Sequence, residues 1–599
     1  MFDEPIYLVS SSVYELAGLA KLPWPALAGL DFLSQEHENA ADVTLAPLKL
    51  LLDVLVQQQY QGGSWGSAAY SSGDRLVNTL AAVAALAFNR TRWTQGRFPA
   101  HYQASLQVGL DWLVALPNYQ PDETDPADLA GLELVVPALR AEIASYGLEL
   151  LPGGETVGGE NAVLAKARAK LGLVPPALIF HPGSTISHAL EFTGPLLKPS
   201  SQQLIAAISL NGSVGNSPSA TAFVLQSIWA ELEQPTQTRM LDYLNRSVNA
   251  ALFWRQIHPT EIEQPLGFSG LGWPVTYPVR HFLEIWYQYY LRQLGAVQAP
   301  KRLVPGTNSL LANLVEVALE GGRNRAGLGA DEHFAVDADT TATYIYLAAE
   351  ELVKAGQAAK LEELIKVLLD FFDEKRGWFF TYPYEMTVSV TTNAHAWQAL
   401  DRVIKLLASA ETGLDLDKLR QIRNRVSLAV KKQACHKTFW RDKWHMSPIY
   451  ATYHVAASGV LTAEEGEPAW LERIIEWVLA NQLPSKGGWN FGSKQEANIT
   501  ANVDETFHAL LLLLYLRQHW LTGDKATAEL EHWPALVSQA IEQGVVCLQD
   551  LIQSQPPYTW PAMWCDKTLY CPYGMLYELS KKLLEQLEPL EVGRFSFAR

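Results

Sequence analysis

The amino-acid sequence predicts an all-α protein built from paired helices, and two observations lead to this fold class. Apolar residues recur with the helical period over long segments, whereas the strict alternation of a half-buried strand is scarce. The clearest helical segments are 74–90, 341–356, 361–372 and 504–520. The second observation is a turn, rich in glycine and aromatic residues, that recurs between helical segments.

This recurring turn reads "QGGSWG" (61–66), "LNGSVGNSPSATAF" (210–223), "EKRGWFFTYP" (374–383) and "KGGWNFG" (486–492), and each copy precedes a helix that begins with small residues. A single copy is accounted for by a glycine that ends a helix with an aromatic ring packed over it. Repetition favours stacked helical hairpins, which in closed form make an α-α barrel with its loops gathered at one end.

Length and composition indicate a large globular protein. A chain of 599 residues is long enough for two or three domains. Hydrophobic residues make up 48% and charged residues 18%, with 19 Trp, 23 Tyr and 20 Phe, so the chain can enclose a large apolar cavity.

Charge and cysteine usage narrow the function classes. The net charge of −17 repels a phosphate backbone, so nucleic acid is a poor partner. Four cysteines without a CxxC pair form neither a disulfide framework nor a metal site, which fits a reducing cytoplasm. No signal peptide is recognisable at the N-terminus, and no window approaches the roughly 18 apolar residues of a membrane span.

The segment "DADTT" concentrates acidic side chains directly before an apolar helix. In one interpretation Asp339 or Thr340 caps that helix and Asp337 is solvated. In the other, an acid faces an apolar cavity, because the following helix is too apolar to be a solvated face. A carboxylic acid with a reference pKa of about 3.9 stays protonated at neutral pH only in an apolar site or beside another carboxylate.

Such an acid could donate its proton to an alkene, and aromatic rings in a water-poor pocket could stabilise the cation that forms. The aromatic segments supply candidates for this wall of the pocket. We take Trp378, Trp444 and Trp489 as candidate substrate contacts.

Colinear motifs along nearly the whole chain resemble the class II terpene cyclases, in particular plant and bacterial copalyl diphosphate synthases. "DADTT" is similar to their DxDD acid motif, and "QGGSWGSAAYSSGDRLVNTLAAVAAL" resembles PDGSWG followed by DRLxNTLA. Further resemblances are "SSVYELAGLAKL" to SxYDTAW, "PDETDPADLAGLELVVPAL" to an EDxxD stretch, "STISHALEF" to LHSLEG, "SPSATAF" to SPSSTAY and "WRDKWHMSPIYATYH" to DKWxxSPYYxTxH.

This resemblance implies a βγ didomain of two α-α barrels with the substrate between them. The β domain is expected at 1–50 and 271–599 and the γ domain at 51–270.

The resemblance also implies how the acid works. Asp339 takes the position of the general acid, and Asp337 and Thr340 would orient and polarise it, with Thr340 replacing the family's last aspartate. A Thr and an Asn four residues apart support the acid in the plant enzymes, and Ser389 and Asn393 stand at that spacing.

The EDxxD stretch of the family contributes to Mg²⁺ and diphosphate handling. It falls here on Asp122 and Asp125, with Glu123 between them and Pro121 in place of the first Glu; the alternative is an acidic surface loop. A family lysine that contacts the diphosphate corresponds to Lys170, with Lys166 one turn away and Lys567 as a further candidate. Lys170 and Lys166 could equally be solvated helix charges.

The end of the reaction is less completely matched. Plant enzymes that form the ent product hold a terminating water with a His and an Asn. His188 matches the first, but Val275 replaces the second, so the stereochemistry and the site of deprotonation stay open. A buried structural histidine is the alternative for His188.

The resemblance therefore implies a Mg²⁺-dependent class II cyclase that converts geranylgeranyl diphosphate to a bicyclic, copalyl-like labdane diphosphate. Alternatives are a drimane-forming cyclase of farnesyl diphosphate or a meroterpenoid cyclase. An α-α barrel glycosidase is disfavoured because residues two apart, such as Asp337 and Asp339, would struggle to flank a sugar at the required roughly 5–10 Å. A non-catalytic helical scaffold is the last alternative.

Overall fold

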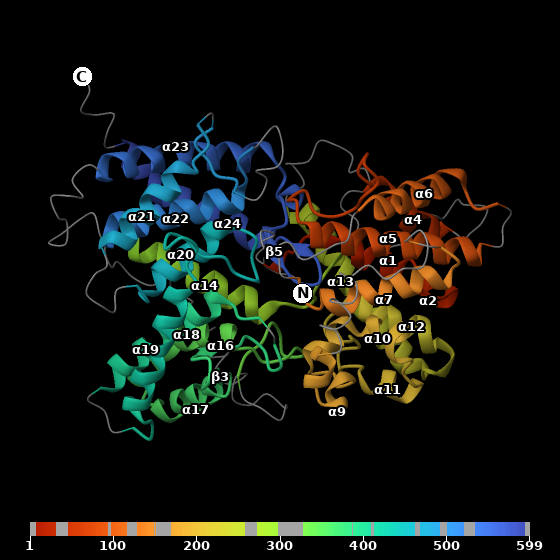
Figure 1. Cartoon of the computed structure of the whole chain (residues 1–599), viewed down its shortest axis with the longest axis horizontal. Helices are drawn as coiled ribbons and strands as arrows, with labels where there is room; N and C mark the ends of the chain where they lie inside the picture. The colour runs from red at the N-terminus through yellow and green to blue at the C-terminus, as the bar shows by residue number, and fades with distance from the viewer. Residues whose placement is uncertain are drawn as a thin grey trace.

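The computed structural model describes residues 7–30, 46–93, 97–116, 129–148, 150, 169–257, 272–297, 327–385, 387–408, 412–461, 468–484, 486–491, 500–519 and 533–592. These residues are mostly helical and form two lobes that lie side by side, as Figure 1 shows. The prediction of an all-α protein with two α-α barrels is confirmed.

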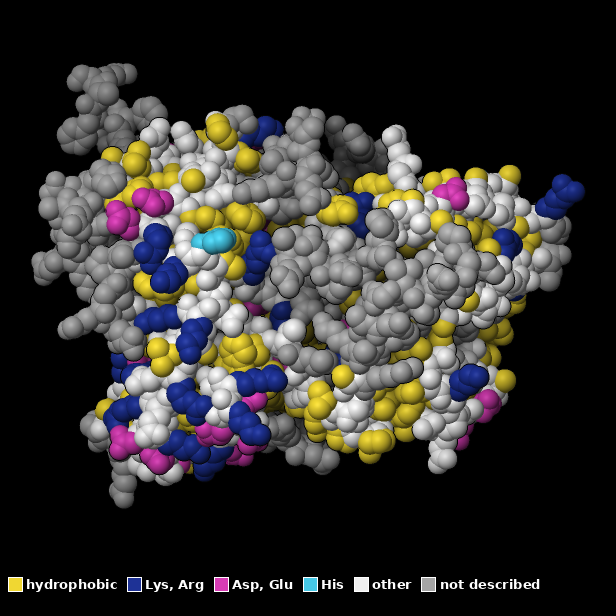
Figure 2. Space-filling view, in the orientation of Figure 1, with side chains coloured by type: hydrophobic (Ala, Val, Ile, Leu, Met, Phe, Trp, Pro, Cys, Tyr) yellow, Lys and Arg dark blue, Asp and Glu magenta, His cyan; other side chains and the backbone are white. Residues whose placement is uncertain are grey.

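The second lobe, which holds the helices from α14 to α24, is a closed ring of inner helices with further helices outside it. The inner ring runs through neighbouring helices in the order α14 (Arg280–Val297), α16 (Ala338–Lys354), α18 (Val390–Leu407), α20 (Pro448–Ser458), α22 (Val503–His519) and α24 (Tyr573–Val592), and α24 contacts α14 again. The outer helices are α17 (Ala358–Leu369), α19 (Leu416–Lys432), α21 (Pro468–Ala480) and α23 (Trp533–Ser554). On the face seen in Figure 2, basic and acidic side chains are interspersed over α17 and α19, as expected for an outer layer.

The first lobe repeats this plan with shorter elements. Its inner ring consists of α1 (Val13–Leu19), α5 (Ser72–Arg92), α7 (Leu132–Ser145), the 3-10 helix η2 (Thr185–Phe192) and α12 (Pro218–Ile228). Around it lie α2 (Trp24–Ala28), α4 (Ala46–Gln57), α6 (Ala100–Ala115), α10 (Thr193–Leu197), α11 (Ser201–Ala206) and α13 (Gln234–Ile257), with α9 (Pro176–Ile179) beside η2 and η3 (Trp229–Glu231) after α12.

Short strand pairs connect these layers. β1 (Ser11–Ser12) pairs with β2 (Trp273–Pro274), β3 (Phe372–Asp373) with β4 (Trp378–Phe379), and β5 (Trp564–Cys565) with β6 (Leu569–Tyr570); η6 (Pro557–Thr559) precedes β5. Ser10 exchanges hydrogen bonds with Cys571 of the second lobe, and α1 then enters the ring of the first lobe. The predicted domain boundaries stay a prediction, and α1 lies with the elements predicted for 51–270.

The repeated turn has a common physical basis in both lobes. The indole N–H groups of Trp65, Trp440 and Trp489 donate to carbonyls near the ends of the preceding outer helices, at 2.7, 2.8 and 2.8 Å. The backbone N–H groups of the same residues donate to Thr79, Thr452 and Thr506 on the inner helix that follows. Each turn therefore ties one outer helix to one inner helix, which satisfies groups at helix ends that would otherwise lack partners.

Glycine is needed in these turns because the backbone takes a left-handed conformation there. Gly63 and Gly487 have φ of +95° and +73°, and a Cβ atom at Gly63 would lie 2.5 Å from the carbonyl oxygen of Val108. Among the described helices, none combines the length and the apolar character that crossing a bilayer requires.

Candidate active site

A cavity of about 210 Å³ lies between the two rings. The second lobe contributes Asp337 and Asp339 from the start of α16, together with a wall of aromatic side chains. The first lobe contributes polar groups from α7 and η2 and the side chain of Lys170. The aromatic residues of the wall are Phe282, Trp286, Phe334, Tyr382, Tyr384, Trp444, Tyr450, Trp564 and Tyr570.

Asp337 forms the N-cap of α16. Its Oδ1 accepts from the Thr340 backbone N–H at 2.6 Å, and its Oδ2 accepts from the Thr340 hydroxyl at 2.9 Å. The interpretation in which Asp339 or Thr340 caps the helix and Asp337 is solvated is wrong, since Asp337 is the cap and is buried.

The surroundings of Asp337 favour its protonated form. Burial raises the pKa of Asp337 well above its usual range, and the charges of Asp339 and Glu385 act in the same direction, against the two hydrogen bonds from Thr340. Burial beside a second carboxylate therefore favours a proton on Asp337.

Asp339 lies in the first turn of α16, where it lines the cavity and meets a histidine that the sequence analysis did not single out. Oδ1 of Asp339 lies 2.6 Å from Nδ1 of His395, which is fully buried on α18. The ring of His395 packs edge-on against the ring of Trp286, with 4.9 Å between the centroids. A buried imidazole therefore fixes one carboxyl oxygen of the acid.

Ser389 and Asn393 do not support Asp339 directly, and this expectation is corrected. Ser389 caps α18 and donates to Asp442 at 2.8 Å. Asn393 accepts from the backbone N–H of Phe379 at 2.8 Å and donates to the Phe379 carbonyl. This is the position at which Thr452 and Thr506 bind the preceding turn in other copies of the repeat.

The three predicted tryptophans have different places. Trp444 lines the cavity, and its indole N–H donates to Thr381 at 3.0 Å. Trp378 and Trp489 do not line it, since Trp378 begins β4 and Trp489 is fully buried in its turn. Trp286 and Trp564 complete the wall instead and were missed, although the aromatic-rich run of α14 is visible in the sequence.

Lys170 lines the end of the cavity that belongs to the first lobe. Its Nζ lies 2.6 Å from Oε1 of Glu133, which lines the same end. Lys166 and the predicted metal ligands Asp122, Glu123 and Asp125 lie outside the described residues.

Lys567 is committed to protein partners. Its Nζ donates to Ser217 and Ser219 at 2.6 and 2.7 Å and lies 3.0 Å from Oε1 of Glu15. The three protons of an ammonium group are thereby engaged. Lys567 follows β5 of the second lobe and inserts among first-lobe groups, so it joins the lobes and offers no free donor for a diphosphate.

His188 lies in the cavity wall beside Asp566. Its Nδ1 lies 2.7 Å from the Gly215 carbonyl, and its Nε2 lies 3.0 Å from Oδ1 of Asp566. Burial raises the pKa of Asp566, but His188 and the hydroxyl of Thr276 outweigh burial and lower the pKa to about 2. Both ring nitrogens of His188 therefore face acceptors, a backbone carbonyl and a carboxylate.

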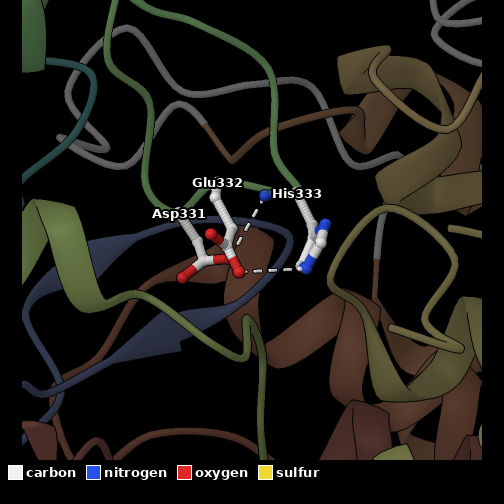
Figure 3. A group of neighbouring side chains, drawn as sticks. All are labelled: Asp331, Glu332 and His333. Carbon is white, nitrogen blue, oxygen red and sulfur yellow. Dashed lines mark hydrogen bonds and ion pairs between the residues drawn. The ribbon is translucent and has the colours of Figure 1, made fainter. Parts of the chain in front are cut away.

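One cluster of described residues offers ligand atoms within 4.8 Å of one another, namely Asp331, Glu332 and His333. Figure 3 shows the two carboxylates next to each other, with the His333 ring turned to Glu332. Asp331 also accepts from the His333 backbone N–H at 3.2 Å. Mg²⁺ prefers oxygen ligands in octahedral geometry, so a set with an imidazole fits it poorly and we assign no Mg²⁺ to this cluster.

The chain is similar to known diterpene cyclases over most of its length. The chain is 26% identical over 572 residues to a type B diterpene cyclase of Mycobacterium tuberculosis, covering 94% of this chain and 93% of that protein. It is 26% identical over 566 residues to a copalyl diphosphate synthase of Streptomyces anulatus, covering 90% and 86%. No protein-family model matches the chain.

Solved structures share the fold. The ent-copalyl diphosphate synthase of Streptomyces platensis superposes with a TM-score of 0.66 at 23% identity, covering 96% of both chains. The Arabidopsis thaliana ent-copalyl diphosphate synthase gives a TM-score of 0.53 at 19% identity, covering 96% of this chain and 60% of that one.

Proposed function

The chain belongs to the class II terpene cyclases, and we propose that it cyclises geranylgeranyl diphosphate by protonation to a bicyclic, copalyl-like labdane diphosphate. The observation that carries this proposal is the position of Asp339, a carboxyl group in the wall of an aromatic cavity whose Oδ1 is bound by buried His395. This arrangement leaves the other carboxyl oxygen for a reactive proton.

Initiation falls to Asp339. The acid gives its proton to the terminal double bond of the bound chain, and the hydrogen bond to His395 stabilises the carboxylate that remains. Asp337 and Thr340 act on Asp339 through the helix start, because Asp337 is bound to Thr340 and lies buried beside the acid.

The aromatic wall stabilises the carbocations that follow. Trp286, Trp444 and Trp564 line the cavity, and the faces of aromatic rings attract positive charge while excluding water. Their positions also shield the folded hydrocarbon chain of the substrate from solvent until the carbocation loses its last proton.

The head group is held at the end that belongs to the first lobe. Lys170 supplies a cation there, and Glu133 holds that cation in place until a diphosphate competes for it. The carboxylates proposed as Mg²⁺ ligands are those of Asp122, Glu123 and Asp125. A Mg²⁺ ion bound by them would neutralise part of the diphosphate charge.

Termination is assigned to the group around His188. Both ring nitrogens of His188 are taken up by acceptors, whereas Asp566 is an anion that lines the cavity, so the base role is assigned to Asp566. An alkyl cation is a strong carbon acid, so a carboxylate or a water bound to it can remove the last proton.

The experiment that tests the proposal offers purified enzyme the geranylgeranyl and farnesyl diphosphates separately, with and without Mg²⁺. Products are treated with phosphatase and identified by gas chromatography and mass spectrometry. A bicyclic C20 alcohol, formed only when the diphosphate is retained during cyclisation, is the expected result. Linear alcohols from both substrates would reject the activity, and a bicyclic C15 alcohol alone would reassign the substrate.

A further inference from the structure

The hydrogen bond between Asp339 and His395 is the first link of a longer buried chain of hydrogen bonds. Nε2 of His395 lies 3.0 Å from Nδ1 of His454 on α20, and Nε2 of His454 lies 3.0 Å from the hydroxyl of Tyr290 on α14. The same hydroxyl lies 2.8 Å from Nε2 of His508 on α22. All four side chains beyond Asp339 are fully buried, so the chain crosses the interior of the second lobe without a described contact to solvent.

The chain ends at Asp504. Nδ1 of His508 lies 2.8 Å from the backbone carbonyl of Asp504 and 3.0 Å from its Oδ1. The indole N–H of Trp564 donates to Oδ2 at 3.0 Å, and Nε2 of His445 lies 3.2 Å from Oδ1. Burial raises the pKa of Asp504, but His445 and His508 outweigh burial and lower the pKa below its usual range. Asp504 is therefore a buried anion that is bound by His508 and Trp564 and lies beside His445.

At this end of the hydrogen-bonded chain, a backbone carbonyl that can only accept and a backbone N–H that can only donate fix which ring nitrogens carry protons. A backbone carbonyl can only accept, so Nδ1 of His508 carries a proton. Nδ1 of His445 accepts from the Ser447 backbone N–H, so the proton of His445 sits on Nε2, facing Asp504. Nε2 of His508, on the other side of the ring, lies beside the Tyr290 hydroxyl, so a second proton there would face that hydroxyl.

That second proton sets the direction of every following link. Nε2–H of His508 donates to the oxygen of Tyr290, and the single hydroxyl proton of Tyr290 then points to His454. Burial and the neighbouring histidines 395, 508 and 445 hold the pKa of His454 well below its usual range, so His454 carries one proton, on Nδ1. His454 donates this proton to Nε2 of His395, which leaves the proton of His395 on Nδ1, facing Asp339.

We propose that His454, Tyr290, His508 and Asp504 are positioning residues that order this chain so that Asp339 becomes a stronger proton donor to an alkene. The inference rests on the proposed function and concerns the same acid. The reactive proton sits on Oδ2 because Oδ1 is occupied by the N–H of His395. Alkenes are weak bases, so an acid gains rate from any group that stabilises the carboxylate it leaves behind.

The hydrogen-bonded chain can stabilise the carboxylate of Asp339 by shifting protons from one link to the next, without net loss of protons. After Oδ2 has given its proton to the alkene, His395 passes its Nδ1 proton to Oδ1 and takes one on Nε2 from His454. His454 takes one from Tyr290, and Tyr290 takes one from His508, which becomes neutral. Only O–H and N–H bonds form and break. The net negative charge moves from Asp339 to the far end of the chain, where neutral His508 no longer balances the anion of Asp504. The shift reverses when Asp339 regains a proton on Oδ2.

Tyr290→Phe tests the proposal because it removes the middle link and keeps the ring. Tyr289→Phe is the matched control: the residue is adjacent on α14 and equally buried, and its hydroxyl has no hydrogen-bond partner among the described residues. We expect Tyr290→Phe to lower kcat on the order of 10-fold to 100-fold with KM unchanged, and Tyr289→Phe to stay within about 2-fold of wild type. Equal kcat values for the two variants overturn the proposal.

A double-mutant cycle separates positioning from a loss of packing. Asp504→Asn removes the charge at the far end, and its effect combined with Tyr290→Phe should be no larger than the greater single effect, because both act through one chain. Additive losses, or a KM that rises in parallel with a fall in melting temperature, count against a positioning role. Asp339→Asn is measured alongside. If Asp339→Asn retains turnover, the proposed function fails; if it is inactive while Tyr290→Phe matches Tyr289→Phe, only the chain is rejected.

Discussion

Nδ1 of His395 lies 2.6 Å from Oδ1 of Asp339 across the contact between α18 and α16. The pair joins the first turn of one inner helix to the buried face of the next, in the wall of the cavity between the lobes. An acid held in this way has one oxygen fixed and one available, which is the arrangement that delivery of a single proton to a bound alkene requires.

Asp339→Asn should abolish turnover while leaving the fold intact, because the amide has nearly the same shape and no acidic proton. A loss of roughly a thousandfold or more in kcat is expected for a general acid. Product formation from geranylgeranyl diphosphate measures the activity, and circular dichroism checks the fold. Retention of more than about a tenth of wild-type turnover would remove Asp339 from the role.

His395→Gln and Ser389→Ala should separate support of the acid from support of the helix. His395→Gln should lower kcat by about 100-fold, since the hydrogen bond to Asp339 is lost or weakened. Ser389→Ala should cost about 1 kcal/mol of unfolding free energy, as a lost N-cap does, with kcat nearly unchanged. Urea unfolding and steady-state kinetics on both variants test this, and the opposite pattern would restore Ser389 as the supporting residue.

Sequence patterns anticipated the helices because local periodicity decides them. The segments 341–356 and 504–520 match α16 and α22 to within a few residues, and the turns around Trp65 and Trp489 occupy equivalent places in their lobes. The position of the acid at a helix start was also predictable, because a "DADTT" run before an apolar helix brings carboxylates to its first turn.

The partner of the acid was not predictable from spacing alone. Asn393 has the spacing of a supporting residue, but it takes the position of the repeat that binds the preceding turn, and His395 faces α16 instead. Which side of α18 meets α16 depends on how the two helices pack. A signal was present in hindsight, since the buried histidines lie six or seven residues after the N-terminal boundary residues of three successive inner helices, in the pairs Ser389 and His395, Ser447 and His454, and Asn502 and His508.

Lys170→Ala should weaken substrate binding without changing the product. Its ammonium lies at the first-lobe end of the cavity, so its loss should raise KM by about 10-fold, the value of one charge-assisted contact of about 1.4 kcal/mol.

Asp122→Ala with Asp125→Ala should raise the Mg²⁺ concentration needed for half-maximal rate. Initial rates over a Mg²⁺ titration provide the measurement, and kinetics that match wild type would place these residues in an uninvolved surface loop.

Acidic pH should destabilise the protein through His454. Burial, followed by the charges of His395, His508 and His445, keeps the folded pKa of His454 well below its reference value of 6.5. Below pH 6.5 the unfolded chain gains a proton that the folded chain does not take, so stability falls as pH falls; above pH 6.5 the contribution is fully present.

The loss from this group amounts to at most about 1.4 kcal/mol per pH unit. Urea unfolding of wild type and His454→Gln at pH 8.0, 6.5 and 5.5 isolates it, because groups common to both proteins cancel in the difference. Wild type should lose more stability than the variant between pH 6.5 and 5.5. Parallel curves for the two proteins would show that His454 does not titrate differently on folding.

Asp566→Asn should change how the reaction ends and not how it begins. Asp339, on α16, starts the cyclisation in the proposed function, whereas Asp566 lies in the cavity wall bound to His188 and Thr276 and is anionic, with a pKa lowered to about 2. Without the carboxylate, the bicyclic cation persists longer, so hydride and methyl shifts or capture by water should increase.

His188→Ala should give a related change by freeing Asp566 to move. Val275→Asn should leave the products unaltered, because Val275 is fully buried and does not line the cavity. Product ratios after phosphatase treatment, measured at equal substrate conversion, test the role of Asp566. A wild-type product ratio from both Asp566→Asn and His188→Ala would assign the terminating base to another part of the cavity wall.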